Sequence, residues 1–156
     1  MAKLNNGDHA PDFELPWTGE GDFKLSDRRG EWIVLAFYPA DNSAVCTKQF
    51  CNYRAEGDKI EGLDAEIIGV SPQDVSSHES FIADNKLNVP LVSDPDLKAA
   101  EAYGVTLGNN IRRSVFVIDP DGKIRFRNVK LLGLTYDDAD SIQDAFEQAK
   151  ENAKAA

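Results

Sequence analysis

The sequence predicts an α/β fold in which helices flank a central mixed β-sheet. Three observations support this prediction: strand-like and helix-like segments alternate, a hairpin pattern comes late, and the 156 residues fit one domain. A chain of this length buries about 70% of its unfolded surface, which is enough for a core without disulfides or metals. We therefore expect a single domain over residues 1–156.

The first part of the chain supplies a hairpin, a buried strand and a helix. Alternating residues on either side of a Gly-rich turn, in DFEL and FKLS, indicate an N-terminal hairpin. The run WIVLAFY is apolar throughout, as expected of a fully buried strand. Apolar residues then recur at helical spacing, so we expect one helix that begins at Cys46 and lays this face on the sheet. The face consists of Phe50, Tyr53, Ile60 and Leu63.

The rest of the chain continues the alternation. We expect a strand in AEIIGVS, a helix from Val75 to Leu87, a strand in VPLVSD and a short helix in LKAAEAYGV that ends at Gly104. SVFVID and KIRFRNV flank a Pro-Asp-Gly turn at 120–122, which predicts a hairpin. No G-x-G-x-x-G follows the first strand, which disfavours a Rossmann fold. The last helix has one apolar face, formed by Ile142, Ala145, Phe146 and Ala149.

Charge and hydropathy exclude several classes of function. A net charge of -10 and a pI near 4.6 argue against nucleic acid or an anionic membrane as partner, since both need a basic surface. The N-terminus lacks a signal-peptide pattern, and the longest apolar run, Trp32 to Tyr38, is too short to span a bilayer. We expect a cytoplasmic protein. In a reducing compartment, cysteines are more often catalytic, redox-sensing or metal-binding than structural.

Two cysteines five residues apart are the only thiols of the chain, and they point to thiol redox chemistry. Cys46 follows the apolar run by a few polar residues, which places it in the first turn of a helix. The free N–H groups and the helix dipole favour the thiolate there, and the thiolate is the nucleophile. The two histidines, His9 and His78, are not near a cysteine in sequence, so we expect no metal and no cofactor. We expect His78 to lie on the surface of a helix.

The segment FYPADNSAVC contains P-x-x-x-S-x-x-C, and the chain also has Cys51 and RSVFVID. With these motifs the sequence resembles the peroxiredoxins of the bacterioferritin-comigratory (PrxQ) type, in the AhpC/TSA superfamily. The resemblance implies a thioredoxin-like fold and thiol-dependent reduction of hydrogen peroxide and organic hydroperoxides. It also implies that Cys46 is the peroxidatic cysteine, that Pro39 and Ser43 lie beside it, and that Arg113 is the active-site arginine.

Each of these residues also has a structural interpretation. Ser43 could be a helix N-cap with or without a catalytic role, and Pro39 could simply end a strand. Arg113 could belong to a solvated arginine pair, and Cys46 could be an inert buried thiol. Their joint spacing favours the active site. The guanidinium, which does not deprotonate, is suited to hold a thiolate and a peroxide oxygen together.

By the same resemblance, Cys51 is the resolving cysteine: it attacks the sulfenic acid on Cys46 to form an intramolecular disulfide, which a thioredoxin-like dithiol reduces. The chain departs from the usual sequence of this subgroup at three positions. Ser43 and Ala44 stand where the subgroup usually has Thr and Pro, and Gln49 stands where it usually has Glu. The sequence is also similar to one-cysteine, AhpE-like members. A peroxidase in which an external thiol resolves the sulfenic acid is therefore an alternative. A thioredoxin-like disulfide reductase, which needs C-x-x-C, and a redox-sensing module are further alternatives. We expect a monomer or homodimer.

The spacing of the cysteines also predicts a conformational change. In a helix, positions five apart differ by about 140° around the axis and by about 8.5 Å between Cα atoms. A disulfide needs less than about 7 Å. We therefore expect both cysteines on one continuous helix in the reduced protein, and local unwinding of that helix on oxidation.

Overall fold

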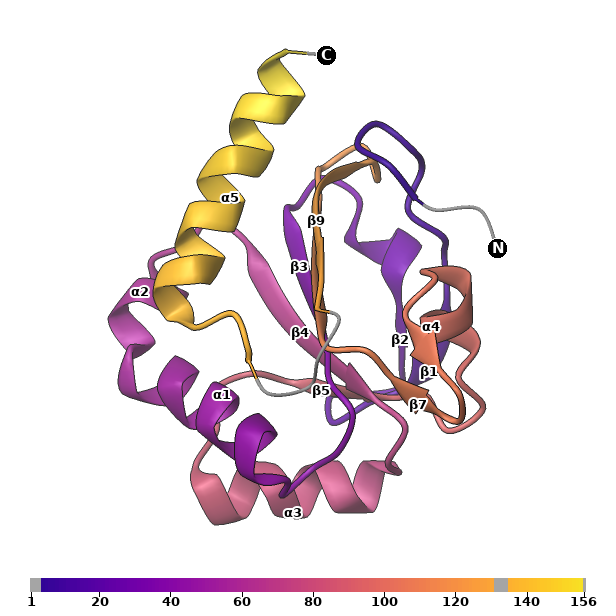
Figure 1. Cartoon of the computed structure of the whole chain (residues 1–156), viewed down its shortest axis with the longest axis vertical. Helices are drawn as coiled ribbons and strands as arrows, with labels where there is room; N and C mark the ends of the chain where they lie inside the picture. Colours follow the sequence, from indigo (N-terminus) through magenta and orange to yellow (C-terminus); the bar gives the residue numbers. More distant parts are fainter. Residues whose placement is uncertain (1–3, 131–134, 156) are drawn as a thin grey trace.

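A five-stranded mixed sheet forms the centre of the molecule (Figure 1). In this computed structural model, residues 4–130 and 135–155 are described. The strand order is β5-β4-β3-β8-β9; β4 is parallel to β3 and β5, and β8 is antiparallel to β3 and β9. The predicted thioredoxin-like α/β fold is confirmed. The strands are β3 Ile33–Phe37, β4 Glu66–Ser71, β5 Leu91–Ser93, β8 Ser114–Ile118 and β9 Ile124–Val129.

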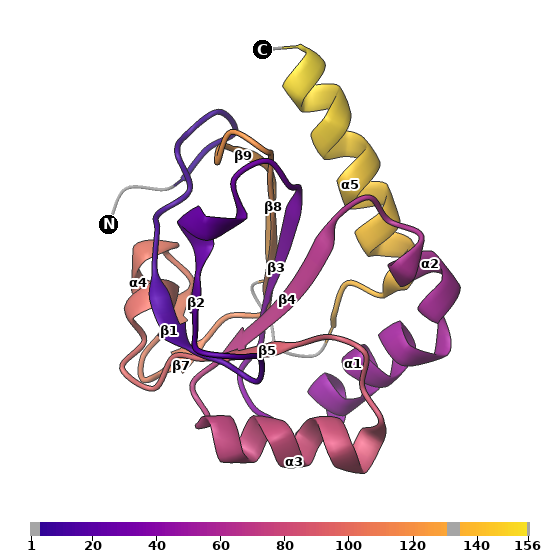
Figure 2. The same ribbon diagram turned by 180° about the vertical axis from the view of Figure 1, so that it is seen from behind.

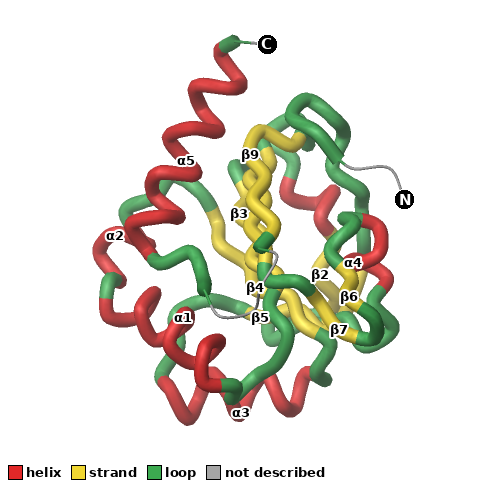
Figure 3. Tube along the Cα trace, viewed as in Figure 1, coloured by secondary structure: helices red, strands yellow, loops and turns green. Residues whose placement is uncertain are grey.

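Two layers cover the two faces of this sheet, which is why its central strands are apolar on both sides (Figures 2 and 3). Side chains alternate along a strand, so Val34 of β3 faces one core cluster while Leu35 faces the other. The first cluster includes side chains of α1, α3 and α5, and the second those of α4 and the N-terminal hairpin. The helices are α1 Ala44–Ala55, α2 Gly57–Glu61, α3 Val75–Asn85, α4 Lys98–Ala102 and α5 Ala139–Lys154.

The predicted N-terminal hairpin is present as β1 Glu14–Pro16 and β2 Asp22–Lys24, followed by a 3-10 turn, η1 Leu25–Arg28. Just after β1, Trp17 makes a bridge to Val92 of the edge strand β5, which shields backbone groups that would otherwise be open to pairing. The sequence patterns did not predict a second small hairpin, which leads into β8. It consists of β6 Thr106–Leu107 and β7 Asn110–Ile111.

The prediction of one helix from Cys46 to Leu63 is wrong. The first helix ends at Ala55, and Glu56, with φ −100° and ψ 37°, separates it from α2. Gly57 follows. Because glycine is about 1 kcal/mol less favourable than alanine inside a helix, continuing α1 through this residue would gain little stability. Ile60 of α2 still packs into the same core cluster as the apolar face of α1, which is why the periodicity continued across the break.

The other predicted helices and strands are confirmed, with ends that differ by one or two residues, and α1 carries both cysteines, as expected. In the part of the chain that the structure describes, no helix has both the length and the apolar character needed to cross a bilayer.

Candidate active site

A loop connects the end of β3 to α1 (Figure 1). Cys46 lies in the first turn of α1. Ser43 is the N-cap: it has extended backbone angles, and its Oγ accepts a hydrogen bond from the Cys46 backbone N–H at 3.3 Å. This cap satisfies one of the free N–H groups at the helix start and fixes where the helix begins. The Cys46 side chain is therefore held at the positive end of the helix and is fully buried.

Arg113 reaches Cys46 because of the register between two central strands. β8 pairs antiparallel with β3, and Ser114 lies opposite Phe37, so the residue before β8 is brought beside the residues that follow β3. The Nη1 atom of Arg113 donates to the Cys46 Sγ at 3.1 Å. The arginine is 4% exposed, so its contact with the sulfur is shielded from water.

A chain of hydrogen bonds fixes the side chain of Gln49 next to this arginine. The Tyr53 hydroxyl donates to the backbone carbonyl of Asp137 at 2.6 Å and accepts from Gln49 Nε2 at 2.9 Å. The Gln49 Oε1 therefore points the other way and accepts from Arg113 Nη1 at 2.7 Å. Burial raises the pKa of Tyr53, which keeps its hydroxyl protonated as a donor. Gln49 thus orients Arg113 without neutralising its charge.

The Nε atom is a further donor of Arg113. It is buried and makes no hydrogen bond within residues 4–130 and 135–155. A buried guanidinium N–H without an acceptor is costly, so this donor is available to a ligand oxygen.

Pro39 and Cys51 are held by other parts of the protein. Pro39 follows β3, and its carbonyl oxygen accepts a long hydrogen bond from Gln73 Nε2 at 3.5 Å. Cys51 is half-buried on α1, and its Sγ contacts the Asn85 Oδ1 of α3 at 3.8 Å. Both cysteines are free thiols in the structure. Ser43, Cys46 and Arg113 are therefore brought together, whereas Cys51 points toward α3.

The expectation that His78 lies on a helix surface is wrong. His78 is on α3 as predicted but is fully buried, and it contacts Asp41 in the loop that precedes Ser43. Sequence reasoning missed both this contact and the Gln49–Tyr53 bond. The i, i+4 spacing of Gln49 and Tyr53 on a helix was a usable signal for the second, because such side chains are neighbours.

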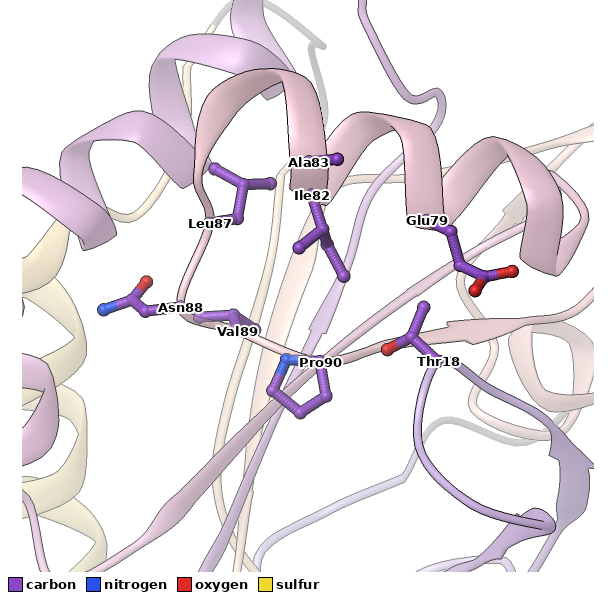
Figure 4. A pocket seen from close by; sticks show the side chains of 8 residues that line it. All are labelled: Thr18, Glu79, Ile82, Ala83, Leu87, Asn88, Val89 and Pro90. Atoms are coloured by element: carbon purple, nitrogen blue, oxygen red, sulfur yellow. The ribbon is translucent and has the colours of Figure 1, made fainter.

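The hollow shown in Figure 4 is elsewhere and is mainly apolar. It lies between α3 and the segment 87–90, with Thr18 at its edge, and Glu79 is the one ionisable side chain among the residues that line it. It therefore lacks the groups that thiol chemistry needs. Over the described residues, no three His, Cys, Asp or Glu side chains are grouped in a way that could hold a metal ion.

Comparison with known families shows which class of protein this chain belongs to. The sequence profile of the AhpC/TSA family matches residues 6–127, most of the chain. The chain belongs to the AhpC/TSA family. Peroxiredoxin Bcp of Bacillus subtilis is 36% identical over 152 residues, 91% of this chain and 97% of its own length. A putative peroxiredoxin bcp of Helicobacter pylori is 38% identical over 143 residues, 85% of this chain and 94% of its own.

Solved peroxiredoxin structures also resemble this one along nearly its whole length. Peroxidoxin BcpB from Mycobacterium tuberculosis aligns with a TM-score of 0.78 at 27% identity, covering 95% of this chain and 97% of that one. The bacterioferritin comigratory protein of Xanthomonas campestris, described for its alkyl peroxide reduction activity, aligns with a TM-score of 0.77 at 28% identity, covering 94% and 96%. The resemblance to peroxiredoxins of this type is confirmed, and the protein is a peroxidase.

Proposed function

We propose that this peroxiredoxin reduces hydrogen peroxide and organic hydroperoxides with the Cys46 thiolate as nucleophile. The observation that carries the proposal is the 3.1 Å contact between Arg113 Nη1 and the Cys46 Sγ inside a buried site. The sulfur attacks one peroxide oxygen, an S–O bond forms and the O–O bond breaks. The other oxygen leaves as hydroxide or alkoxide and takes a proton, and Cys46 becomes a sulfenic acid.

The surrounding groups are suited to the charge that moves in this step. Negative charge passes from sulfur to the leaving oxygen, so a fixed cation that reaches both atoms stabilises the transition state more than the ground state. The unpartnered Nε of Arg113 supplies a donor for a peroxide oxygen. The Ser43 hydroxyl accepts from the Cys46 N–H and has its own proton left to donate to the peroxide. Pro39, which has no N–H, would help to exclude water.

For the second half of the cycle we propose that Cys51 resolves the sulfenic acid. Its thiol attacks the Cys46 sulfur, an S–S bond forms, and the sulfenic oxygen leaves as water. A thioredoxin-like dithiol then reduces the disulfide to two thiols. Two facts support this role: Cys51 is the only other thiol in the sequence, and it is partly exposed on the same helix.

A one-cysteine cycle is the second candidate, and one observation favours it. The intact helix holds Cys51 against Asn85 rather than toward Cys46, so an external thiol could resolve the sulfenic acid without any unwinding. The two cycles differ in the product that follows the first oxidation.

Peroxide consumption with a thioredoxin system as electron source tests the peroxidase assignment. Cys46→Ser is expected to abolish turnover while the fold is retained, because a serine hydroxyl is not appreciably ionised at neutral pH. Single-turnover oxidation provides the matched control: Cys51→Ser, the same substitution on the same helix, is expected to keep the first oxidation, whereas Cys46→Ser is expected to lose it. Turnover that persists in Cys46→Ser would refute the role of Cys46.

Intact mass after oxidation tests the role of Cys51. Wild type is expected to lose two hydrogens as the disulfide forms. Cys51→Ser is expected to gain one oxygen and, with excess peroxide, a second, because its sulfenic acid has no partner thiol in the chain. A stable sulfenic mass in the wild type would favour the one-cysteine cycle instead.

A further inference from the structure

A buried polar cluster lies behind the loop that carries Ser43. We call it the Asp41 cluster; it consists of Tyr38, Asp41, Ser77 and His78. The Asp41 carboxylate accepts three hydrogen bonds: from the Tyr38 hydroxyl at 2.6 Å, the Ser77 hydroxyl at 2.7 Å and His78 Nδ1 at 2.8 Å. The Asp41 side chain is 1% exposed and the His78 side chain 0% exposed. A carboxylate this deeply buried is retained only when its oxygens are satisfied.

His78 lies between two hydrogen-bond acceptors. Its Nε2 lies 3.0 Å from the backbone carbonyl of Val92, and its Nδ1 faces the Asp41 carboxylate. His78 therefore links Asp41 to the backbone of β5. Burial of Asp41 opposes its charge, but the bonds from His78, Tyr38 and Ser77 outweigh this and hold the pKa of Asp41 below its usual range. Asp41 and His78 therefore form a buried hydrogen-bonded pair in which Asp41 is ionised.

This pair ties the active-site loop to three separate elements. Tyr38 directly follows β3, Ser77 and His78 belong to α3, and Val92 is in β5. A second attachment acts on the backbone of the same loop, where the Asp41 N–H donates to Gln73 Oε1 at 2.9 Å. The loop is thus fixed at Asp41 through both its side chain and its backbone.

The loop needs such attachment because its conformation is not intrinsically favoured. Asn42, directly after Asp41, has φ of 61°, in the left-handed region that residues other than glycine seldom adopt. Ser43 follows it and caps α1. If the anchor at Asp41 is lost, Asn42 can relax, and the position of the Ser43 cap and the Cys46 turn is no longer fixed.

We propose that Asp41 is a positioning residue for the peroxide step, and that Ser77 and His78 act through it. The proposal rests on Cys46 being the peroxidatic cysteine. Asp41 makes no bond to the thiol; it holds residues 39–43 so that the Cys46 sulfur lies against Arg113. Small displacements of reacting groups lower rates steeply, with about 1 Å costing on the order of 10²-fold.

The structure also shows how to release the loop without leaving an unsatisfied core. In Asp41→Ala, the His78 tautomer that carries its proton on Nε2 keeps the hydrogen bond to the Val92 carbonyl. Its Nδ1 then becomes an acceptor, and the Tyr38 hydroxyl already lies 3.4 Å from it. The variant therefore removes the anchor while Tyr38 and His78 retain partners. Asp41→Asn is the conservative variant, because its amide oxygen still accepts and its NH2 can donate to the neutral ring.

The test is the single-turnover oxidation of Cys46 by hydrogen peroxide, followed by rapid quenching and intact mass. Asp41→Ala is expected to lower the rate constant about 10-fold or more at full amplitude, and Asp41→Asn to recover most of it. Ser77→Ala is expected to slow the step a few-fold, and to add nothing in the Asp41→Ala background because it acts through the same carboxylate. Ser76→Ala, an exposed serine on the same helix, is the matched control and should react as the wild type does.

A purely structural role would give a different result. Partial unfolding lowers the amplitude, and the folded fraction then reacts at the wild-type rate constant. A wild-type rate constant in Asp41→Ala, at any amplitude, overturns the proposal, as does a Ser77→Ala effect that adds fully to that of Asp41→Ala. Failure of the wild type itself to react would instead refute the role of Cys46.

Discussion

Formation of a disulfide between Cys46 and Cys51 is expected to unwind part of α1, within the segment from Ser43 to about Arg54. The helix is continuous from Ala44 to Ala55, so the two Cα atoms are about 8.5 Å apart and the side chains diverge by about 140°. A disulfide requires less than about 7 Å. Phe50 and Tyr53, both fully buried, lie within or next to the segment that must move. Releasing each aromatic ring costs about 1.5–3 kcal/mol, so losing both removes about 3–6 kcal/mol of local stability.

Hydrogen exchange measures this loss directly. Because each 1.4 kcal/mol corresponds to a factor of ten, amides of residues 46–54 are expected to exchange about 10²- to 10⁴-fold faster in the oxidised protein. Strand β3, fully buried in the sheet, is the internal control and should stay unchanged. Cys51→Ser exposed to the same peroxide is the matched control, since it is oxidised without forming the bond. Equal protection in both redox states, with the disulfide confirmed by mass, would refute the reasoning.

Three further predictions concern the groups around the thiol. Arg113→Ala is expected to slow the peroxide step by about 10² or more in stopped-flow measurements, because it removes the buried cation that contacts sulfur; a rate within a few-fold of wild type would contradict this role. Tyr53→Phe, which leaves Gln49 free to turn its amide, is expected to slow the same step less than Arg113→Ala does; an effect as large would mean that the hydroxyl does more than orient Gln49. The depressed pKa of Asp41 means that its stabilisation is complete above its ordinary value of 3.8 and is lost as the pH falls through the lower folded value. The free energy of unfolding in urea should therefore fall less steeply below about pH 4 in Asp41→Asn than in wild type, and identical slopes would contradict the buried pair.

The sheet and the position of the thiol could be predicted because they depend on local patterns. An apolar run buried on both faces predicts β3 by itself, and a polar loop after it predicts a helix start near Cys46. Arg113 could be placed at the site only by resemblance, since its contact with Cys46 depends on the pairing of β8 with β3. The break at Glu56 was missed because Ile60 keeps the apolar periodicity of α1 beyond it.

The contact between Asp41 and His78 could not be predicted from the sequence for a physical reason. The two residues are 37 positions apart, and the spacing that places His78 on the same helix face as Phe81 does not identify a partner in a distant loop. A polar residue on a helix is expected to be solvated unless a partner compensates its desolvation, and the partner here lies in a loop of irregular backbone. A pattern along one element carries no information about such a pair.

The contact between Cys46 and Arg113 spans 67 positions of the chain, and this gives the thiol an unusual dependence on the native state. In an unfolded chain both cysteines are equally open to alkylating reagents such as iodoacetamide. In the native state Cys46 is hidden from bulky reagents yet surrounded by groups that favour attack on a small peroxide. Loss of tertiary structure thus reverses the selectivity of one sulfur atom: it gains reactivity toward alkylating reagents as it loses reactivity toward peroxide.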